Sequence, residues 1–124
     1  RAVRPDELAD ILAGRGIVRG TGRTTATQQV LGTVHKQNPW VSATRSPAAA
    51  VHFATRGFTE ASNAIVRIDL AKLSNQVFDV STRELAEQAL KHPRAVNYAA
   101  AAVEVLIRGN IPQEAIEIVY RGAK

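Results

Sequence analysis

The chain of 124 residues contains no cysteine and no methionine, and only 5% of its residues are aromatic. The lack of cysteine excludes disulfides and thiolate metal sites and leaves no indication of a redox compartment, so packing must stabilise the fold. No apolar run approaches the roughly 18 residues of a membrane span, which excludes a transmembrane helix. Because the chain opens at Arg1 without a start methionine, we expect a fragment of a longer protein with no signal peptide to read.

The residues that are present are typical of a globular domain. Hydrophobic residues make up 45% of the chain and charged residues 22%, and the aliphatic side chains are spread throughout it. Such a composition disfavours disorder. The length suits a single hydrophobic core, so we predict one domain over residues 1–124.

The positive charge is unevenly distributed along the chain. Residues 1–56 carry eight Lys and Arg against three Asp and Glu, a net charge of +5, whereas residues 57–124 carry eight of each sign. A basic half indicates an anionic partner, such as a phosphate-bearing ligand, a nucleic acid or an acidic protein. The alternative is ordinary solubilising charge.

Periodicity and end signals predict an α+β fold. Strands are expected at the first residues and at 40–44, 64–70, 77–80, 104–107 and 116–120; helices are expected from Pro5, at 47–56 and at 82–90, with a possible short helix within 18–38. Pro93 is expected to end the preceding helix, and strands are expected to dominate the second half. For the alanine-rich run at 99–103, propensity leaves helix and loop both open.

Common catalytic signatures are missing from the sequence. It contains no GxSxG, no HExxH, no P-loop and no GxGxxG between a strand and a helix. The three histidines, His35, His52 and His92, do not have the spacing of a metal cluster, so no metal site is expected.

Several segments nevertheless form an ordered pattern. The chain opens with RAVRPDEL, residues 35–44 read HKQNPWVSAT, residues 47–54 read PAAAVHFA, and residues 104–112 read EVLIRGNIP before the closing segment IEIVY. In this order they resemble the cholera-toxin-like mono-ADP-ribosyltransferases, the class with an Arg, Ser and Glu site, as found at the C-terminus of bacterial polymorphic toxins. The resemblance implies an ADP-ribosyltransferase-like fold: two small packed antiparallel-rich sheets with short flanking helices around an NAD cleft.

The resemblance implies NAD as co-substrate and assigns catalytic roles to Glu104, Ser42 and Arg1. Cleavage of the nicotinamide–ribose bond passes through an oxocarbenium-like state, which a carboxylate such as Glu104 can stabilise through the ribose 2′-hydroxyl. Arg1 would hold the phosphates and ribose with a permanently charged guanidinium. Ser42 would hold Glu104 or the ribose in place by a hydrogen bond.

Further NAD-binding residues are assigned by the same resemblance. Thr44 follows Ser42 at the spacing that shares a strand face, and His35 would contact the adenosine end. An aromatic clamp on nicotinamide is left open among Phe53, Trp40 and Phe58.

Each assignment has an ordinary alternative. Arg1 could be a frayed terminus, and Arg4 would then be the arginine that binds NAD. Ser42 and Glu104 could be surface residues of their strands. Trp40 and Phe53 could be core residues.

One departure from the family concerns the acceptor of ADP-ribose. Arginine-modifying members have Glu two residues before the catalytic Glu, and several others have Gln, whereas this chain has Ala102. Arginine modification is therefore in doubt, and the acceptor of ADP-ribose is left open between a protein and a structured RNA. The basic half of the chain would attract an RNA through its phosphates. An NAD glycohydrolase is the alternative enzyme, and a non-catalytic basic nucleic-acid-binding module is the alternative outside enzymes.

The toxin resemblance also implies a cellular setting. We expect secretion or injection by a bacterium, action in the target-cell cytoplasm without membrane insertion, and a cognate immunity protein, which we expect to be acidic.

Overall fold

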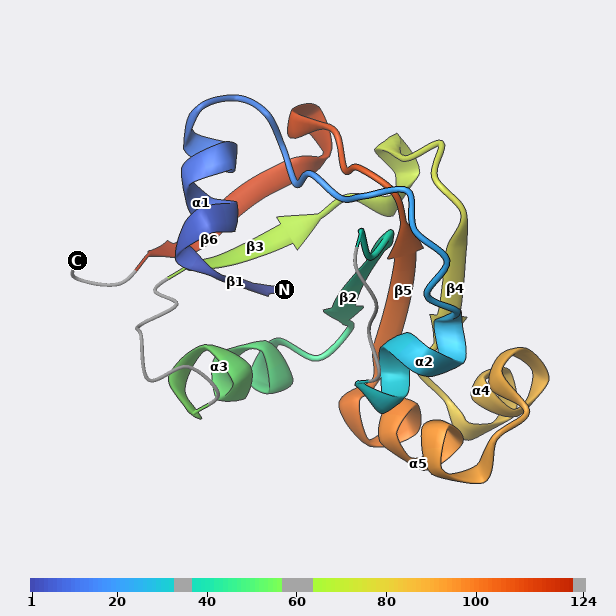
Figure 1. The fold of residues 1–124 in the computed structure, drawn as a ribbon. Coiled ribbons are helices and arrows are strands. Elements are labelled where there is room, and N and C mark those ends of the chain that lie inside the picture. The colour runs from blue at the N-terminus through green and yellow to red at the C-terminus, as the bar shows by residue number, and fades with distance from the viewer. Residues whose placement is uncertain (33–36, 57–63, 122–124) are drawn as a thin grey trace. The chain divides into compact units, whose positions relative to one another are not determined.

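The computed structural model describes residues 1–32, 37–56 and 64–121, which form helices and two three-stranded antiparallel sheets (Figure 1). The chain divides into two compact units. The first comprises Arg1–Val18, Pro47–Ser74 and Asn110–Lys124, and the second comprises Arg19–Ser46 and Asn75–Gly109. The expected α+β class, with two small antiparallel sheets, is confirmed. That the chain is one domain stays a prediction.

The first unit contains a sheet with the strand order β1-β3-β6. Its strands are β1 (Ala2–Val3), β3 (Ala64–Ile68) and β6 (Ile116–Arg121). The helices are α1 (Pro5–Leu12), α3 (Pro47–Arg56) and two 3-10 turns, Leu70–Lys72 and Gln113–Ala115. Helix α3 packs against β1 and β3.

Local signals place α1 directly after β1. Proline suits the first turn of a helix because its missing N–H would have no intrahelical partner there, and Pro5 occupies that position. Asp6 and Glu7 lie in the first turn, where negative charge favours the helix dipole. Gly14, with a φ of +82°, follows the end of the helix, where glycine adopts the left-handed conformation without steric cost.

The second unit contains a sheet with the strand order β2-β5-β4, and three helices pack against it (Figure 1). The strands are β2 (Trp40–Thr44), β4 (Val77–Val80) and β5 (Glu104–Arg108), and the helices are α2 (Ala26–Leu31), α4 (Arg83–Leu90) and α5 (Pro93–Ala102). Buried residues of the sheet and of all three helices form its core: Ala26, Trp40, Val80, Ala86, Leu90, Ala95, Val96, Ala99 and Leu106. The predicted strands and the helix at 82–90 are confirmed, with Thr82 as its N-cap.

Helix α5 corrects the expectation that Pro93 ends a helix. Helix α4 already ends at Leu90, and Lys91 follows in the left-handed region. Pro93 is the first residue of α5, and His92 is the N-cap, since its Nδ1 accepts a hydrogen bond from the backbone N–H of Ala95 at 3.4 Å. The second half thus contains α5 in addition to the predicted α4, beside its four strands β3, β4, β5 and β6.

No helix in the described part of the chain is long and apolar enough to cross a membrane.

A substitution at Leu106 tests the contribution of core packing to the stability of the second unit. Its side chain is fully buried in the centre of the middle strand. We expect Leu106→Ala to lower the free energy of unfolding by about 2–5 kcal/mol, because it removes buried methyl groups and leaves a cavity. Leu85→Ala on α4, where the side chain is 38% exposed, is the matched control. Denaturant unfolding of both variants checks this, and equal midpoints would contradict it.

Asp79 makes the stability of the same sheet depend on pH. Burial alone would raise the pKa of Asp79, but hydrogen bonds from Ser81 and Arg45, together with the Arg45 charge, lower it below 3.8. A lowered folded-state pKa adds stability above the unfolded value of about 3.9, and this stability is lost as the pH falls through the folded pKa. We expect the stability difference between the parent chain and Asp79→Asn to shrink from pH 6 towards about pH 2. A constant difference in urea unfolding over this range would contradict the assignment.

Candidate functional site

Three polar residues share one face of the sheet of the second unit. In the antiparallel register, Thr44 is paired with Glu104 and Ser42 with Leu106. Paired residues of antiparallel strands project to the same face, and so do alternate residues of one strand. Ser42, Thr44 and Glu104 are therefore neighbours on this face. Glu104 is only 9% exposed.

A tight connection leads from α5 into the strand that bears Glu104. Ala102 is the last residue of α5, and Val103 turns the chain with a φ of +50°. The Thr44 hydroxyl donates to the carbonyl oxygen of Ala102 at 2.6 Å and accepts the backbone N–H of Ser46 at 3.1 Å. Ala102, at the position that carries Glu or Gln in the resembled family, is thus the end of a helix, and its backbone carbonyl is hydrogen-bonded to β2.

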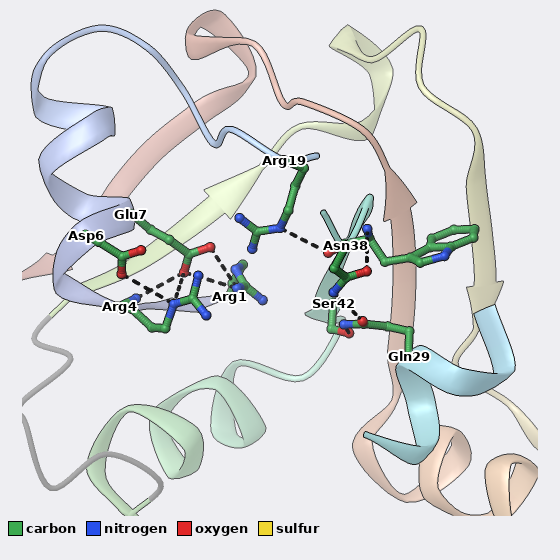
Figure 2. A network of polar contacts seen from close by, with 9 residues as sticks. Arg1, Arg4, Asp6, Glu7, Arg19, Gln29, Asn38 and Ser42 are labelled. Carbon is green, nitrogen blue, oxygen red and sulfur yellow. Dashed lines mark hydrogen bonds and ion pairs between the residues drawn. The ribbon is translucent and has the colours of Figure 1, made fainter. Parts of the chain in front are cut away.

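Ser42 belongs to a chain of side-chain hydrogen bonds (Figure 2). The Gln29 amide nitrogen of α2 donates to Ser42 Oγ at 2.9 Å, and the Asn38 amide nitrogen donates to Gln29 Oε1 at 2.8 Å. Asn38 Oδ1 in turn accepts the backbone N–H of Trp40 at 3.1 Å. Ser42 is partly buried, so the alternative of an ordinary surface serine is disfavoured.

Trp40 is a core residue of the second unit. Its side chain is 2% exposed, and its indole N–H donates to the carbonyl oxygen of Thr24 at 2.6 Å. The Phe78 ring lies 5.4 Å away, between ring centroids, and the Arg108 guanidinium lies 5.6 Å from the Trp40 ring centroid. These contacts favour the core alternative for Trp40 over a nicotinamide clamp.

The remaining aromatic and histidine candidates differ in position. Phe53 lies on α3 in the first unit and is 44% exposed, so the core alternative does not fit it. His35 and Phe58 lie outside the described residues.

Arg1 is held firmly in the first unit. Its backbone donates to the carbonyl oxygen of Val66 at 2.9 Å, and its own carbonyl accepts the Val66 N–H at 2.9 Å, so it is not frayed.

The guanidinium of Arg1 forms an ion pair with a buried carboxylate (Figure 2). Arg1 Nη2 donates to both carboxylate oxygens of Glu7, at 2.9 and 3.1 Å, and the Arg4 N–H donates to the same carboxylate at 3.1 Å. The side chains of Arg1 and Glu7 are 15% and 3% exposed, whereas the Arg4 side chain is 50% exposed. The Arg1 guanidinium therefore has a set orientation.

Sequence reasoning missed three residues of these networks. Glu7 is not among the residues assigned from the sequence, although its place three residues after the helix N-cap is the position from which Glu reaches back to that residue's N–H. Asn38 before Pro39 carries the signal of an Asx turn. Gln29 has no such signal, because its contact with Ser42 depends on how α2 packs beside β2.

Among the described residues, no three His, Asp or Glu side chains come together as metal ligands.

The topology and these contacts define an α+β protein with two three-stranded antiparallel sheets, one of which carries neighbouring hydroxyl and carboxylate groups on one face. Residues 23–119 match a family described as Domain of unknown function (DUF7587). Since the match extends over more than half of the chain, the protein belongs to this family. No curated protein and no solved structure showed significant similarity to the chain.

The pair of Arg1 and Glu7 can be tested by removing one charge. Loss of one partner leaves a buried charge uncompensated, so we expect Glu7→Gln to lower the free energy of unfolding by about 3–5 kcal/mol. Asp6→Asn, whose side chain is 74% exposed beside Arg4, should change it by less than about 1 kcal/mol. Chemical denaturation measures both, and a small effect of Glu7→Gln would show that the ion pair contributes little.

Proposed function

We propose that the protein is a mono-ADP-ribosyltransferase that cleaves NAD at the nicotinamide–ribose bond and transfers ADP-ribose to a protein or a structured RNA. The observation that carries the proposal is the placement of Glu104 on the same sheet face as Ser42 and directly opposite Thr44. The description of the family assigns no activity, so the proposal rests on these residues and on the order of the resembling segments.

The burial of Glu104 supports a chemical role over a structural one. An ionised carboxylate loses hydration when it is buried, and an apolar side chain at the same position would avoid this cost. Glu104 lies two residues from Leu106, on the face that contributes to the apolar core. Such a conflict between local packing and residue type is expected at functional sites.

The electrostatics around Glu104 suit a reaction that develops positive charge. The C-terminal end of a helix carries a partial negative charge, and α5 ends two residues before Glu104. The carboxylate and the helix end together would favour the oxocarbenium-like ribose that forms as nicotinamide leaves.

The roles of the other residues follow the resemblance. Ser42 and Thr44 lie beside Glu104 in the second unit. Ser42 is assigned to Glu104 or the ribose of NAD, and Thr44 is assigned to NAD binding. Arg1 belongs to the first unit, and its assignment to the NAD phosphates or ribose rests on the resemblance alone. Phe53 and His35 stay candidates for the nicotinamide and adenosine ends.

The nature of the acceptor is the open part of the proposal. Ala102 supplies only a methyl group at the end of α5, and its carbonyl is bonded to Thr44, so no side chain there can orient an arginine. This favours another acceptor, and water as the acceptor would make the protein an NAD glycohydrolase. The proposed setting is a bacterial toxin that acts in a target cell and is neutralised by an acidic immunity protein.

The test follows NAD with a labelled adenylate in the presence of a bacterial lysate. We expect Glu104→Gln to slow nicotinamide release at least about 100-fold, because contacts that strengthen at the oxocarbenium stage contribute several kcal/mol. Glu87→Gln makes the same change at a side chain that is 62% exposed on α4 and should leave the rate unchanged.

The destination of the label separates the remaining possibilities. Label retained on protein or RNA identifies a transferase and its acceptor, and nicotinamide release without retained label identifies a glycohydrolase. Equal activity of a folded Glu104→Gln variant, or no NAD cleavage by the parent chain, would overturn the enzymatic proposal. Binding to nucleic acid by such an inactive chain would then support the basic binding module.

A further inference from the structure

We propose that Gln29 and Asn38 are positioning residues that orient the hydroxyl of Ser42 as a hydrogen-bond donor. The inference rests on the proposed function for its catalytic part, whereas the direction of the hydrogen bonds rests on the geometry of the second unit. Gln29 lies outside the segments that resemble the ADP-ribosyltransferases, and Asn38, within the segment 35–44, has no role that the resemblance assigns.

The direction of the bonds begins at a backbone amide. An N–H group can only donate, so the side-chain atom of Asn38 that lies 3.1 Å from the Trp40 nitrogen must be its oxygen. The other end of the Asn38 amide is then its NH2 group, and it lies 2.8 Å from Gln29. The orientation of this carboxamide, which is normally ambiguous, follows from its partner.

The same reasoning passes through Gln29 to Ser42. Because Asn38 presents a donor, Gln29 must turn its oxygen towards Asn38, and its NH2 group then lies 2.9 Å from Ser42 Oγ (Figure 2). Ser42 Oγ accepts this bond, so the hydroxyl hydrogen is directed to a different partner. Two carboxamides thus transmit the polarity of one backbone N–H to the serine hydroxyl.

The series of hydrogen bonds from the Trp40 N–H through Asn38 and Gln29 to Ser42 is called the relay below. Helix α2, which carries Gln29, is held in place by several contacts. Thr25 caps α2 by accepting the N–H of Gln28 at 3.1 Å, and the Thr27 hydroxyl donates to the carbonyl oxygen of Leu90 at 3.0 Å. Val30 and Leu31 of α2 pack against the core of the second unit. Gln29 is therefore held beside β2 by contacts on both sides of it in the helix.

A donating serine is the form that the proposed chemistry uses. An ionised carboxylate accepts hydrogen bonds and cannot donate them. Glu104 is a diagonal neighbour of Ser42 across the strands, a separation of about 7–8 Å that a long side chain can span. A ribose oxygen of NAD is the other acceptor within this chemistry.

The first test reverses the direction of the hydrogen bond between residue 29 and Ser42 without removing either side chain. Glutamate in place of Gln29 presents only acceptors, so Ser42 must donate to it, and we expect Gln29→Glu to slow nicotinamide release about tenfold or more. Gln28→Glu adds the same charge one residue earlier and retains the acceptor for the Thr25 N–H. It should keep the parent rate.

Asn38→Asp makes the same reversal from a residue that contacts Gln29. The aspartate would turn the Gln29 amide round, so that Ser42 faces an oxygen. We expect a similar loss of activity. In a Ser42→Ala background, both Gln29→Glu and Asn38→Asp should have no further effect on the rate, because the relay acts through the hydroxyl. A further loss in that background would indicate a structural or charge effect and would overturn the proposal.

Nuclear Overhauser spectra of the complete chain report the orientation without relying on activity. In the parent chain, the Gln29 side-chain amide protons should give strong cross-peaks to the Ser42 β-protons, and these should weaken in Asn38→Asp. Strong parent cross-peaks to Asn38 instead of Ser42 would overturn the relay, whatever the activity. A parent chain that cleaves no NAD would overturn the proposed function and the catalytic part of this inference, while the spectra still decide the direction of the bonds.

Discussion

The candidate site depends on the antiparallel register between β2 and β5. This register sets Thr44 opposite Glu104 and Ser42 two residue pairs further along. A shift of β2 by one residue would turn Ser42 and Thr44 to the face opposite to that of Glu104. Two features hold it: Leu106 is locked into the helical core, and Thr44 is bonded to the end of α5. The same contacts therefore stabilise the packing of the second unit and fix the geometry of its polar residues.

The relay to Ser42 and the ion pair of Arg1 with Glu7 are two ways of orienting a partly buried polar side chain. Glu7 orients the Arg1 guanidinium through charge and burial, whereas Gln29 and Asn38 orient the Ser42 hydroxyl through neutral amides. Neutral amides impose a direction on a hydroxyl without adding charge beside Glu104. A neutral relay is consistent with a site in which a carboxylate supplies the negative charge.

Most elements could be predicted from local signals, and the failures have specific physical reasons. Pro5 and Thr82 marked helix starts, and β2, β4 and β5 had strand composition. Helix α5 was missed because proline is compatible with a first helical turn as well as with a helix end, so Pro93 alone does not distinguish them.

The sequence by itself determined the class of fold and the order of the residues proposed for the site, because capping, alternation and residue type are local properties. The tertiary structure decided which strands pair: β5 and β6 follow one another in the chain but belong to different sheets. It also decided that Glu7 faces Arg1 and that Gln29 reaches Ser42. Such contacts depend on the packing of whole elements, which no local pattern encodes.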